Sequence, residues 1–201
     1  MTDIKTIGLT GGIACGKSSV SKLLAQNGIE VINADELAHQ TITLNGPAYE
    51  EVLKEFGRRI LKQSGEIDRR KLGAIIFADP KARKRLESII HPVVRTDIMR
   101  AIAEAKTKGF SCLVVEIQLL FEVGWECLFD RIWVVSSSIE KQVTRLQKRD
   151  QLTEEMARTR IAAQLPLAYK EERADVVIYN DEGLLELANQ VQQVIKSELI
   201  Q

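Results

Sequence analysis

The feature that most constrains this chain is the segment Gly11-Gly12-Ile13-Ala14-Cys15-Gly16-Lys17-Ser18, which fits the pattern G-x-x-x-x-G-K-[ST] in full. Residues Ile4 to Thr10 before it are rich in β-branched side chains and predict a strand. Lys17 to Gln26 after it has apolar residues at helical spacing, and Asn27-Gly28 predicts the end of that helix. A glycine loop between a strand and a helix is the context in which this pattern binds phosphates.

We therefore expect the loop to bind the phosphates of a nucleoside triphosphate, because glycines let successive backbone N–H groups turn toward a phosphate at a helix N-terminus. Lys17 is expected to reach the β- and γ-phosphates, and the Ser18 hydroxyl to be a ligand of Mg²⁺. A glycine turn that binds nothing is the alternative. A helix N-terminus can depress the pKa of a nearby thiol, and Cys15 stands at such a position. The expected nucleotide-binding residues are Gly11, Gly12, Ile13, Ala14, Cys15, Gly16, Lys17, Ser18 and Ser19.

The strand pattern along the chain predicts an α/β fold with a parallel sheet. Ile29 to Ile32 is a second strand, so the chain opens as strand, loop, helix and strand, which favours a right-handed parallel crossover. Cys112 to Val115 and Ile132 to Val135 are continuous apolar runs, typical of parallel strands that are covered on both faces. Ala174 to Ile178 is the last predicted strand, and an apolar stripe from Leu184 to Ile195 predicts a closing helix.

Two further segments show helical patterns only. Glu36 to about His91 has no convincing strand, which indicates a helical insertion between two strands of the sheet. Pro92 is predicted as the first residue of a helix that runs to about Lys108, where Gly109 ends it. Glu140 to about Gln164 is predicted to be helical and is strongly basic at its start.

Asp35 is the candidate general base. If the γ-phosphate is transferred, the acceptor hydroxyl must lie in line with the leaving oxygen, and a base should receive its proton. Asp35 follows the second predicted strand, so its carboxylate is expected at the sheet edge where the phosphates lie. The alternative is that Asp35 merely caps a helix that begins at Glu36.

Three other charged residues are candidates around the phosphates. Glu116 ends the run Cys112 to Val115, and a carboxylate in that position can orient Mg²⁺ or its water; the alternative is a solvated strand end. Arg145 and Arg149 are four residues apart and would share a helix face, from which they could neutralise charge that develops in transfer. An ordinary solvated basic face is the alternative for both arginines.

Composition excludes several classes of protein. With 201 residues and 28 Lys+Arg against 28 Asp+Glu, the chain is neither a nucleic-acid coat nor a polybasic membrane binder. Three cysteines without a Cys-x-x-Cys pair favour a reducing compartment, and two histidines are too few for a His-built metal centre. No apolar run approaches the ~18 residues of a membrane span, and residues 1–3 begin no secretion signal. We expect a cytoplasmic protein without nucleic-acid or membrane partners.

Nine segments, in this order along nearly the whole chain, share a pattern with one known family: Leu9-Thr10-Gly11-Gly12-Ile13, Gly16-Lys17-Ser18, Val31-Ile32-Asn33-Ala34-Asp35, Arg70 to Phe77, His91-Pro92, Leu119-Leu120-Phe121-Glu122, Arg145 to Asp150, Ile161 to Gln164 and Ala174-Asp175 through Asn180. Taken together, they resemble the dephospho-coenzyme A kinases. The resemblance implies ATP-dependent phosphorylation of the ribose 3′-hydroxyl of dephospho-coenzyme A, the final step of coenzyme A biosynthesis. Asp35 takes the position of the catalytic aspartate of the family, and Arg145 and Arg149 take those of its lid arginines.

The resemblance also implies a division of the chain. A three-layer P-loop NTPase core would comprise residues 1–35, 92–140 and 165–201, with a helical acceptor-binding insertion at 36–91 and a small helical lid at 141–164. We expect a monomer or a weak homo-oligomer that uses ATP and Mg²⁺ and takes dephospho-coenzyme A as its substrate.

Three positions depart from the family pattern. Ala14-Cys15 stands where the family usually has Gly-Ser, Asn33 replaces a frequent Asp, and Gln118 replaces a usual Pro. Ala14 is compatible with the loop if its position does not require a positive φ.

Other functions are weaker alternatives. A different small-molecule kinase, such as one acting on a nucleoside monophosphate, would differ only in its acceptor. A nucleotide-gated switch is disfavoured, because the chain has no Asn-Lys-x-Asp segment to select guanine and no Asp-x-x-Gly segment to sense the γ-phosphate. Nucleic-acid binding ranks last, since the basic clusters lack interleaved aromatic residues.

Overall fold

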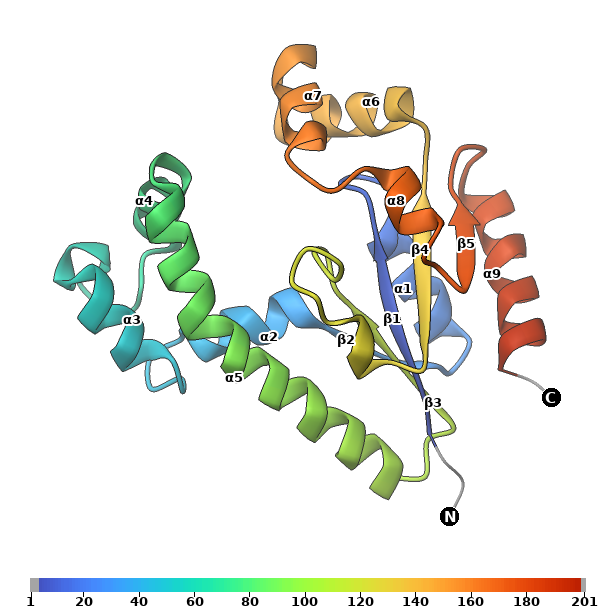
Figure 1. Ribbon diagram of the computed structural model, residues 1–201, viewed down its shortest axis with the longest axis horizontal. Helices are drawn as coiled ribbons and strands as arrows, with labels where there is room; N and C mark the ends of the chain where they lie inside the picture. The colour runs from blue at the N-terminus through green and yellow to red at the C-terminus, as the bar shows by residue number, and fades with distance from the viewer. Residues whose placement is uncertain (1–3, 200–201) are drawn as a thin grey trace. The chain divides into compact units, whose positions relative to one another are not determined.

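The computed structural model describes residues 4–199, which form a five-stranded parallel sheet with helices around it (Figure 1). The strand order is β2-β3-β1-β4-β5, and every neighbouring pair is parallel. The predicted α/β fold is confirmed, and each predicted strand is found with its ends shifted by at most two residues. The strands are β1 (Lys5–Gly11), β2 (Glu30–Asn33), β3 (Cys112–Glu116), β4 (Arg131–Ser136) and β5 (Val176–Tyr179).

The chain divides into two compact units. The first combines the residues before Ala34 with those from Glu104 onward, and the second is Ala34–Ala103. Residues 1–3 and 200–201, which belong to the expected core ranges, lie outside the described residues. The second unit is longer than the insertion expected at 36–91, because its last helix does not begin where the sequence indicated.

Pro92 lies inside a helix and does not begin one. Helix α5 (Pro80–Thr107) runs through it without a break, so the prediction of a helix start at Pro92 was wrong. An internal proline removes one backbone hydrogen bond and costs about 3 kcal/mol in a helix. Burial on both sides of Pro92 offsets this cost, since Leu86 precedes it and Val94 and Ile98 follow it, all of them buried.

The core of the first unit lies between the sheet and two helices. Helices α1 (Lys17–Gln26) and α9 (Leu184–Glu198) contact each other and bury their apolar stripes against the strands. Both helices were predicted. The fully buried Trp133 of β4 and Leu24 of α1 belong to this cluster. A short helix, α8 (Leu167–Glu171), contacts β4, and a 3₁₀ turn, η2 (Glu126–Leu128), precedes that strand.

The second unit is helical. Besides α5, it contains α2 (Ala34–Thr41), α3 (Tyr49–Phe56), the 3₁₀ turn η1 (Arg58–Ile60) and α4 (Arg69–Ala78). Its own apolar cluster includes Val52 and Phe56, which lie one helical turn apart on α3.

The segment predicted to be helical from Glu140 to about Gln164 contains two helices, α6 (Ile139–Asp150) and α7 (Glu154–Ala162). Gln151 ends α6 with a left-handed φ of 54°, and the Thr153 side chain accepts a hydrogen bond from the backbone N–H of Met156 and caps α7. Buried Val143, Leu146 and Ala157 join the two helices, and Ile13 and Ala14 of the glycine loop pack against them. The helix pair is therefore seated on the loop.

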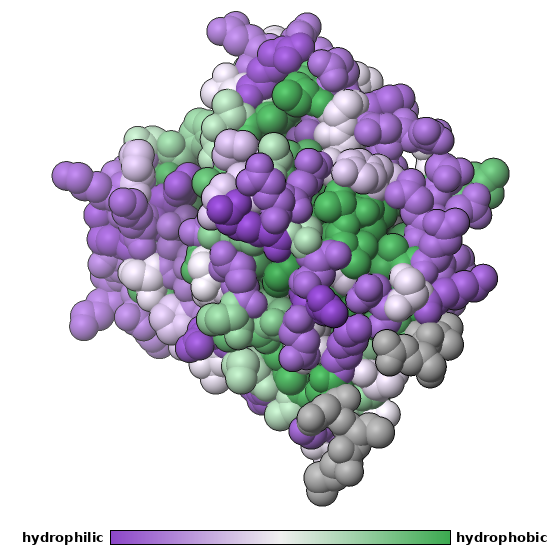
Figure 2. All heavy atoms as spheres, turned by 45° about the vertical axis from the view of Figure 1, so that its right-hand side comes forward, coloured by the Kyte–Doolittle hydropathy of each residue, from purple (hydrophilic) through white to green (hydrophobic). Residues whose placement is uncertain are grey.

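Hydrophilic side chains cover most of the face shown in Figure 2, with apolar patches between them. Leu184 and Leu185, at the start of α9, are among the exposed apolar residues. Within residues 4–199, no helix combines the length and apolar character that crossing a bilayer requires.

Candidate active site

The glycine loop connects β1 to α1, as predicted. Gly16 precedes α1 with a φ of 99°, and a Cβ added there would lie 2.2 Å from Nδ2 of Asn180. Gly11 has a φ of 155°, and a Cβ there would lie 2.2 Å from the carbonyl oxygen of Val135. Both motif glycines are therefore required by their backbone conformation and by a close neighbour.

Lys17, the lysine of the motif, lies at one end of the loop. It is 6% exposed, and its Nζ donates a hydrogen bond to the carbonyl oxygen of Gly12 at 3.2 Å. The ammonium group is therefore held beside the first residues of the loop, over the start of α1. A cation in that position is suited to the terminal phosphates of a nucleotide.

Ser18 and Glu116 lie together at the edge of the sheet. Glu116 is the last residue of β3 and is 8% exposed, so its interpretation as a solvated strand end is wrong. Its Oε1 accepts a hydrogen bond from the Ser18 hydroxyl at 3.2 Å, and its Oε2 accepts one from the Ser21 hydroxyl at 2.6 Å. The two serines, three residues apart on α1, thus bring this helix to the carboxyl end of β3.

The oxygen atoms of Ser18 and Glu116 fit Mg²⁺, a hard cation that proteins hold through one or two carboxylates together with substrate phosphates. Among residues 4–199, no three His, Cys, Asp or Glu side chains come together to form a metal cage. The donor set of this chain therefore suits a metal ion that is shared with phosphate oxygens.

Arg145 and Arg149 have different surroundings, although they lie four residues apart on α6. The half-buried Arg145 guanidinium donates to the carbonyl oxygens of Ala14 at 3.2 Å, Cys15 at 3.3 Å and Asn180 at 2.6 Å. It thus fixes the backbone of the glycine loop. Arg149 is exposed and pairs with Asp150 through bonds of 2.8 and 3.0 Å. This hydrogen-bonded pair raises the pKa of Arg149 and lowers that of Asp150.

Ala14 and Cys15 are the two loop residues that depart from the family pattern, and the structure describes the backbone of the first and the thiol of the second. Ala14 has a φ of 59°, so its position does require the left-handed conformation that favours glycine. Cys15 is fully buried, and burial raises the pKa of its thiol despite the nearby Lys17. The depression of the thiol pKa that a helix N-terminus can cause is not found at Cys15, because desolvation outweighs the neighbouring charge.

Two residues that sequence reasoning assigned no role hold the loop from later parts of the chain. Oε1 of Gln164 accepts a hydrogen bond from the backbone N–H of Ile13 at 2.9 Å, and Nδ2 of Asn180 donates to the carbonyl oxygen of Cys15 at 2.8 Å. Both lie at the ends of segments that resemble the family. No local pattern signals their contacts, which depend on the tertiary structure.

Asp35 belongs to the second unit and is exposed in the first turn of α2. Since α2 begins at Ala34, Asp35 does not cap a helix that begins at Glu36, and that alternative was wrong. The strand before it ends beside Glu116, because Asn33 is the register partner of Glu116 between β2 and β3.

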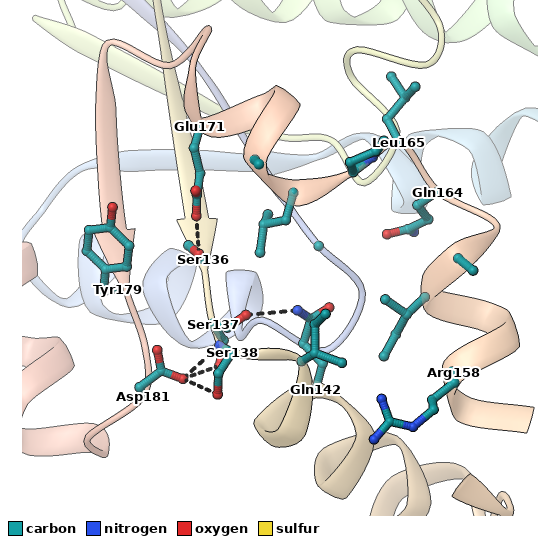
Figure 3. Close-up of a pocket in the computed structure, with 17 residues that line it drawn as sticks. Ser136, Ser137, Ser138, Gln142, Arg158, Gln164, Leu165, Glu171, Tyr179 and Asp181 are labelled. Carbon is teal, nitrogen blue, oxygen red and sulfur yellow. Dashed lines mark hydrogen bonds between the residues drawn. The ribbon is translucent and has the colours of Figure 1, made fainter. Parts of the chain in front are cut away.

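A cavity of about 760 Å³ lies next to the glycine loop within the first unit (Figure 3). Gly12, Gln142 and Gln164 line it on the loop side, and Tyr179 and Asp181 line it at the end of β5. Figure 3 shows Tyr179 and Asp181 across the cavity from Gln164 and Arg158. Burial opposes ionisation of Asp181, but hydrogen bonds from Ser138 and Ser137 outweigh it and lower the pKa of its carboxyl.

The parallel sheet, the glycine loop and the paired Ser18 and Glu116 define a P-loop kinase fold. A shikimate kinase from Acinetobacter baumannii, solved in complex with shikimate, shares this fold with a TM-score of 0.54 at 16% identity, over 100% of this chain and 97% of that one. More specifically, the model of the dephospho-CoA kinase family matches residues 5–186. The chain belongs to that family.

Comparisons with individual relatives support this family membership. A dephospho-CoA kinase from Geobacillus kaustophilus is 44% identical over 191 residues, which are 95% of this chain and 95% of the relative. The structure of a dephospho-CoA kinase from Campylobacter jejuni matches with a TM-score of 0.73 at 30% identity, and the match covers 96% of each chain.

Proposed function

We propose that this protein transfers the γ-phosphoryl group of ATP to the ribose 3′-hydroxyl of dephospho-coenzyme A and releases coenzyme A and ADP. The observation that carries this proposal is an intact phosphate loop in a chain that matches the dephospho-CoA kinase family from residue 5 to residue 186. This reaction would be the final step of coenzyme A biosynthesis.

ATP is proposed to bind with its phosphates on residues 11–19, and Lys17 is proposed to lie beside the β- and γ-phosphates. Mg²⁺ is proposed to bind the Ser18 hydroxyl, with Glu116 as a second ligand or as the partner of a metal-bound water. The 3.2 Å hydrogen bond between these residues supports a shared role. When bound, Mg²⁺ neutralises charge on the phosphate oxygens.

Asp35 is proposed as the general base. It follows the end of β2 by two residues, and β2 pairs with the strand that ends in Glu116. In the transfer, the 3′-oxygen forms a bond to the γ-phosphorus, the bond from that phosphorus to the oxygen of ADP breaks, and the hydroxyl proton moves to the Asp35 carboxylate.

Residues 141–164, which include most of α6 and all of α7, are proposed to act as a lid. Arg145 would keep the loop in shape while Arg149 neutralises charge on the transferring group, and closure would exclude water that could hydrolyse ATP. The contacts of Ile13 and Ala14 with this helix pair support coupling between lid and loop.

The acceptor is proposed to bind the second unit, which contains the insertion expected at 36–91. A small cavity of about 200 Å³ in this unit is lined by Lys62, which pairs with Glu66 at 2.9 Å, by Arg69 beside His39, and by apolar side chains such as Ile67. Lys62 and Arg69 are the lining groups that would attract an acceptor that carries its own phosphates. We also propose that the protein is a cytoplasmic monomer or weak homo-oligomer. The balance of 28 basic and 28 acidic residues supports the absence of nucleic-acid and membrane partners.

The direct test is incubation of the purified protein with Mg-ATP and dephospho-coenzyme A, followed by mass spectrometry. We expect a single added phosphoryl group on the ribose 3′-oxygen. Nucleoside monophosphates in parallel reactions test the alternative kinase. Phosphorylation of a monophosphate in place of dephospho-coenzyme A, or a preference for GTP with no phosphorylated acceptor, would overturn the proposal.

A further inference from the structure

One peptide group of the glycine loop is held on both of its sides. The carbonyl oxygen of Gly12 accepts a hydrogen bond from the Lys17 ammonium at 3.2 Å, and the N–H of Ile13 donates one to Oε1 of Gln164 at 2.9 Å. The Gly12 carbonyl and the Ile13 N–H belong to the same peptide bond. Lys17 and Gln164, which are far apart in the sequence, are therefore joined through a single rigid unit.

The geometry of this peptide separates the roles of its two partners. The bond is trans and planar, so its C=O and its N–H point in opposite directions. Gln164 therefore lies on the side of the peptide that faces away from the Lys17 ammonium. It acts on the phosphate side of the loop only through the orientation of the peptide.

The loop by itself does little to fix that orientation. Rotation of the peptide changes ψ of Gly12 and φ of Ile13, and Gly12 has no Cβ to restrict it. The Gly12 carbonyl also accepts a hydrogen bond from the N–H of Cys15, at the longer distance of 3.3 Å. Without Gln164, the Ile13 N–H would lose its partner, and rotation toward another acceptor would carry the Gly12 carbonyl away from Lys17.

Gln164 is itself held in place by its neighbours. Its backbone N–H donates to the carbonyl oxygen of Ile161 at 3.2 Å, and the N–H of Leu165 donates to Oε1 of Glu122, also at 3.2 Å. Figure 3 shows Gln164 and Leu165 next to each other on the segment between α7 and α8. The side-chain amide thus reaches the loop from a fixed backbone, as a positioning residue requires.

We propose that Gln164 is a positioning residue for Lys17. It keeps the Gly12 carbonyl turned toward the Lys17 ammonium, so that this cation already stands where the β- and γ-phosphates bind. ATP then binds without the cost of ordering the lysine side chain. This role deepens the function proposed above and rests on the binding of ATP phosphates to the loop.

The test is a double-mutant cycle on the Kd for Mg-ATP, measured by titration calorimetry without an acceptor. Gln164→Leu removes the accepting oxygen at similar size, and Lys17→Met removes the ammonium. Gln164→Glu keeps an accepting oxygen on the side of the peptide away from Lys17. Gln192→Leu is the matched control, because it removes a hydrogen bond of 2.6 Å to Asn27 at the other end of α1.

We expect Gln164→Leu to raise the Kd for ATP about five- to tenfold, the net effect of one hydrogen bond, and Gln164→Glu to bind ATP more tightly than Gln164→Leu. In the Lys17→Met background, Gln164→Leu should change the Kd by less than about twofold, because the two residues act as a unit. Both Gln→Leu variants should lower the melting temperature by a similar amount, about 2–4 °C, but the control should keep its affinity for ATP.

Three results would overturn the positioning role: an unchanged Kd in Gln164→Leu, an undiminished effect of this substitution in the Lys17→Met background, or no tighter binding by Gln164→Glu. ATP binding needs no acceptor, so these results do not depend on phosphoryl transfer. Failure of the unmodified protein to bind Mg-ATP would instead remove the proposed function, and the positioning role with it.

Discussion

The ammonium group of Lys170 lies 2.8 Å from Oε1 of Glu122, and no part of the Lys170 side chain is exposed. The same carboxylate oxygen accepts a hydrogen bond from the backbone N–H of Leu165 at 3.2 Å. Glu122 thus ties together α8 and the residue that directly follows Gln164, which itself contacts the glycine loop. This ion pair, buried on its lysine side, therefore fixes the point at which the chain continues from α7 to α8.

Removing one member of this pair is expected to destabilise the protein strongly. Lys170→Met leaves the Glu122 carboxylate largely buried without its cation, which costs about 3 kcal/mol. Urea denaturation measures the loss, and the double variant Glu122→Leu with Lys170→Met should recover part of it. Equal stability of Lys170→Met and the unmodified protein would show that the pair contributes nothing.

Glu116→Gln is expected to weaken the response to Mg²⁺. The amide can still accept hydrogen bonds from Ser18 and Ser21, but the negative charge beside the metal is lost. We expect the Mg²⁺ concentration for half-maximal activity to rise by about 10- to 100-fold, in the range found for groups that support a metal ligand. The exposed Glu30→Gln of β2 is the control. An unchanged Mg²⁺ dependence in Glu116→Gln would remove this residue from the metal site.

Ala14→Gly is expected to stabilise the protein. A left-handed residue with a Cβ costs roughly 1–2 kcal/mol, and the added freedom of glycine in the unfolded chain returns roughly 0.5–1 kcal/mol of that. The net gain in the free energy of unfolding should be about 0.5–1 kcal/mol. Ala163→Gly is the control, because Ala163 is exposed with a right-handed φ of −76° and should lose stability. A loss in Ala14→Gly as large as in the control would contradict the assignment of strain.

Asp35→Asn is expected to leave the affinity for ATP nearly unchanged while turnover falls by about 10²- to 10⁴-fold, the usual contribution of a general base. Steady-state kinetics and ATP binding measured on the same preparation separate the two effects. Glu36→Gln, which changes the adjacent exposed carboxylate, should keep near-normal turnover. Near-normal turnover in Asp35→Asn would show that another group accepts the proton.

Local patterns predicted the parts of the fold that depend on neighbours in sequence. The strand before Gly11, the loop and the bounds of α1 follow from residue types and spacing within 26 residues, and all three are found. The helix through Pro92 was missed, because its continuity comes from burial of residues on both sides of the proline, which outweighs the local penalty.

The surroundings of the site residues could be predicted only in part. The sequence indicated Ser18 and Glu116 separately as groups near Mg²⁺, and the structure brings the two into hydrogen-bond contact. It did not indicate that Arg145 would bind the carbonyls of Ala14 and Cys15, because that contact joins residues about 130 positions apart. The left-handed φ of Ala14 was hidden for a similar reason, since alanine itself rarely signals this conformation.

The position of β1 has a consequence for how the protein is made. This strand is the middle one of the sheet, and its partners β3 and β4 begin only at Cys112 and Arg131. A ribosome must therefore translate more than half of the chain before the first strand can pair, and must reach Gln164 and Asn180 before the phosphate loop has all its supports. Until then, β1 has no partner strand, and Ile7 and Leu9, which the folded protein buries completely, lack the neighbours that cover them.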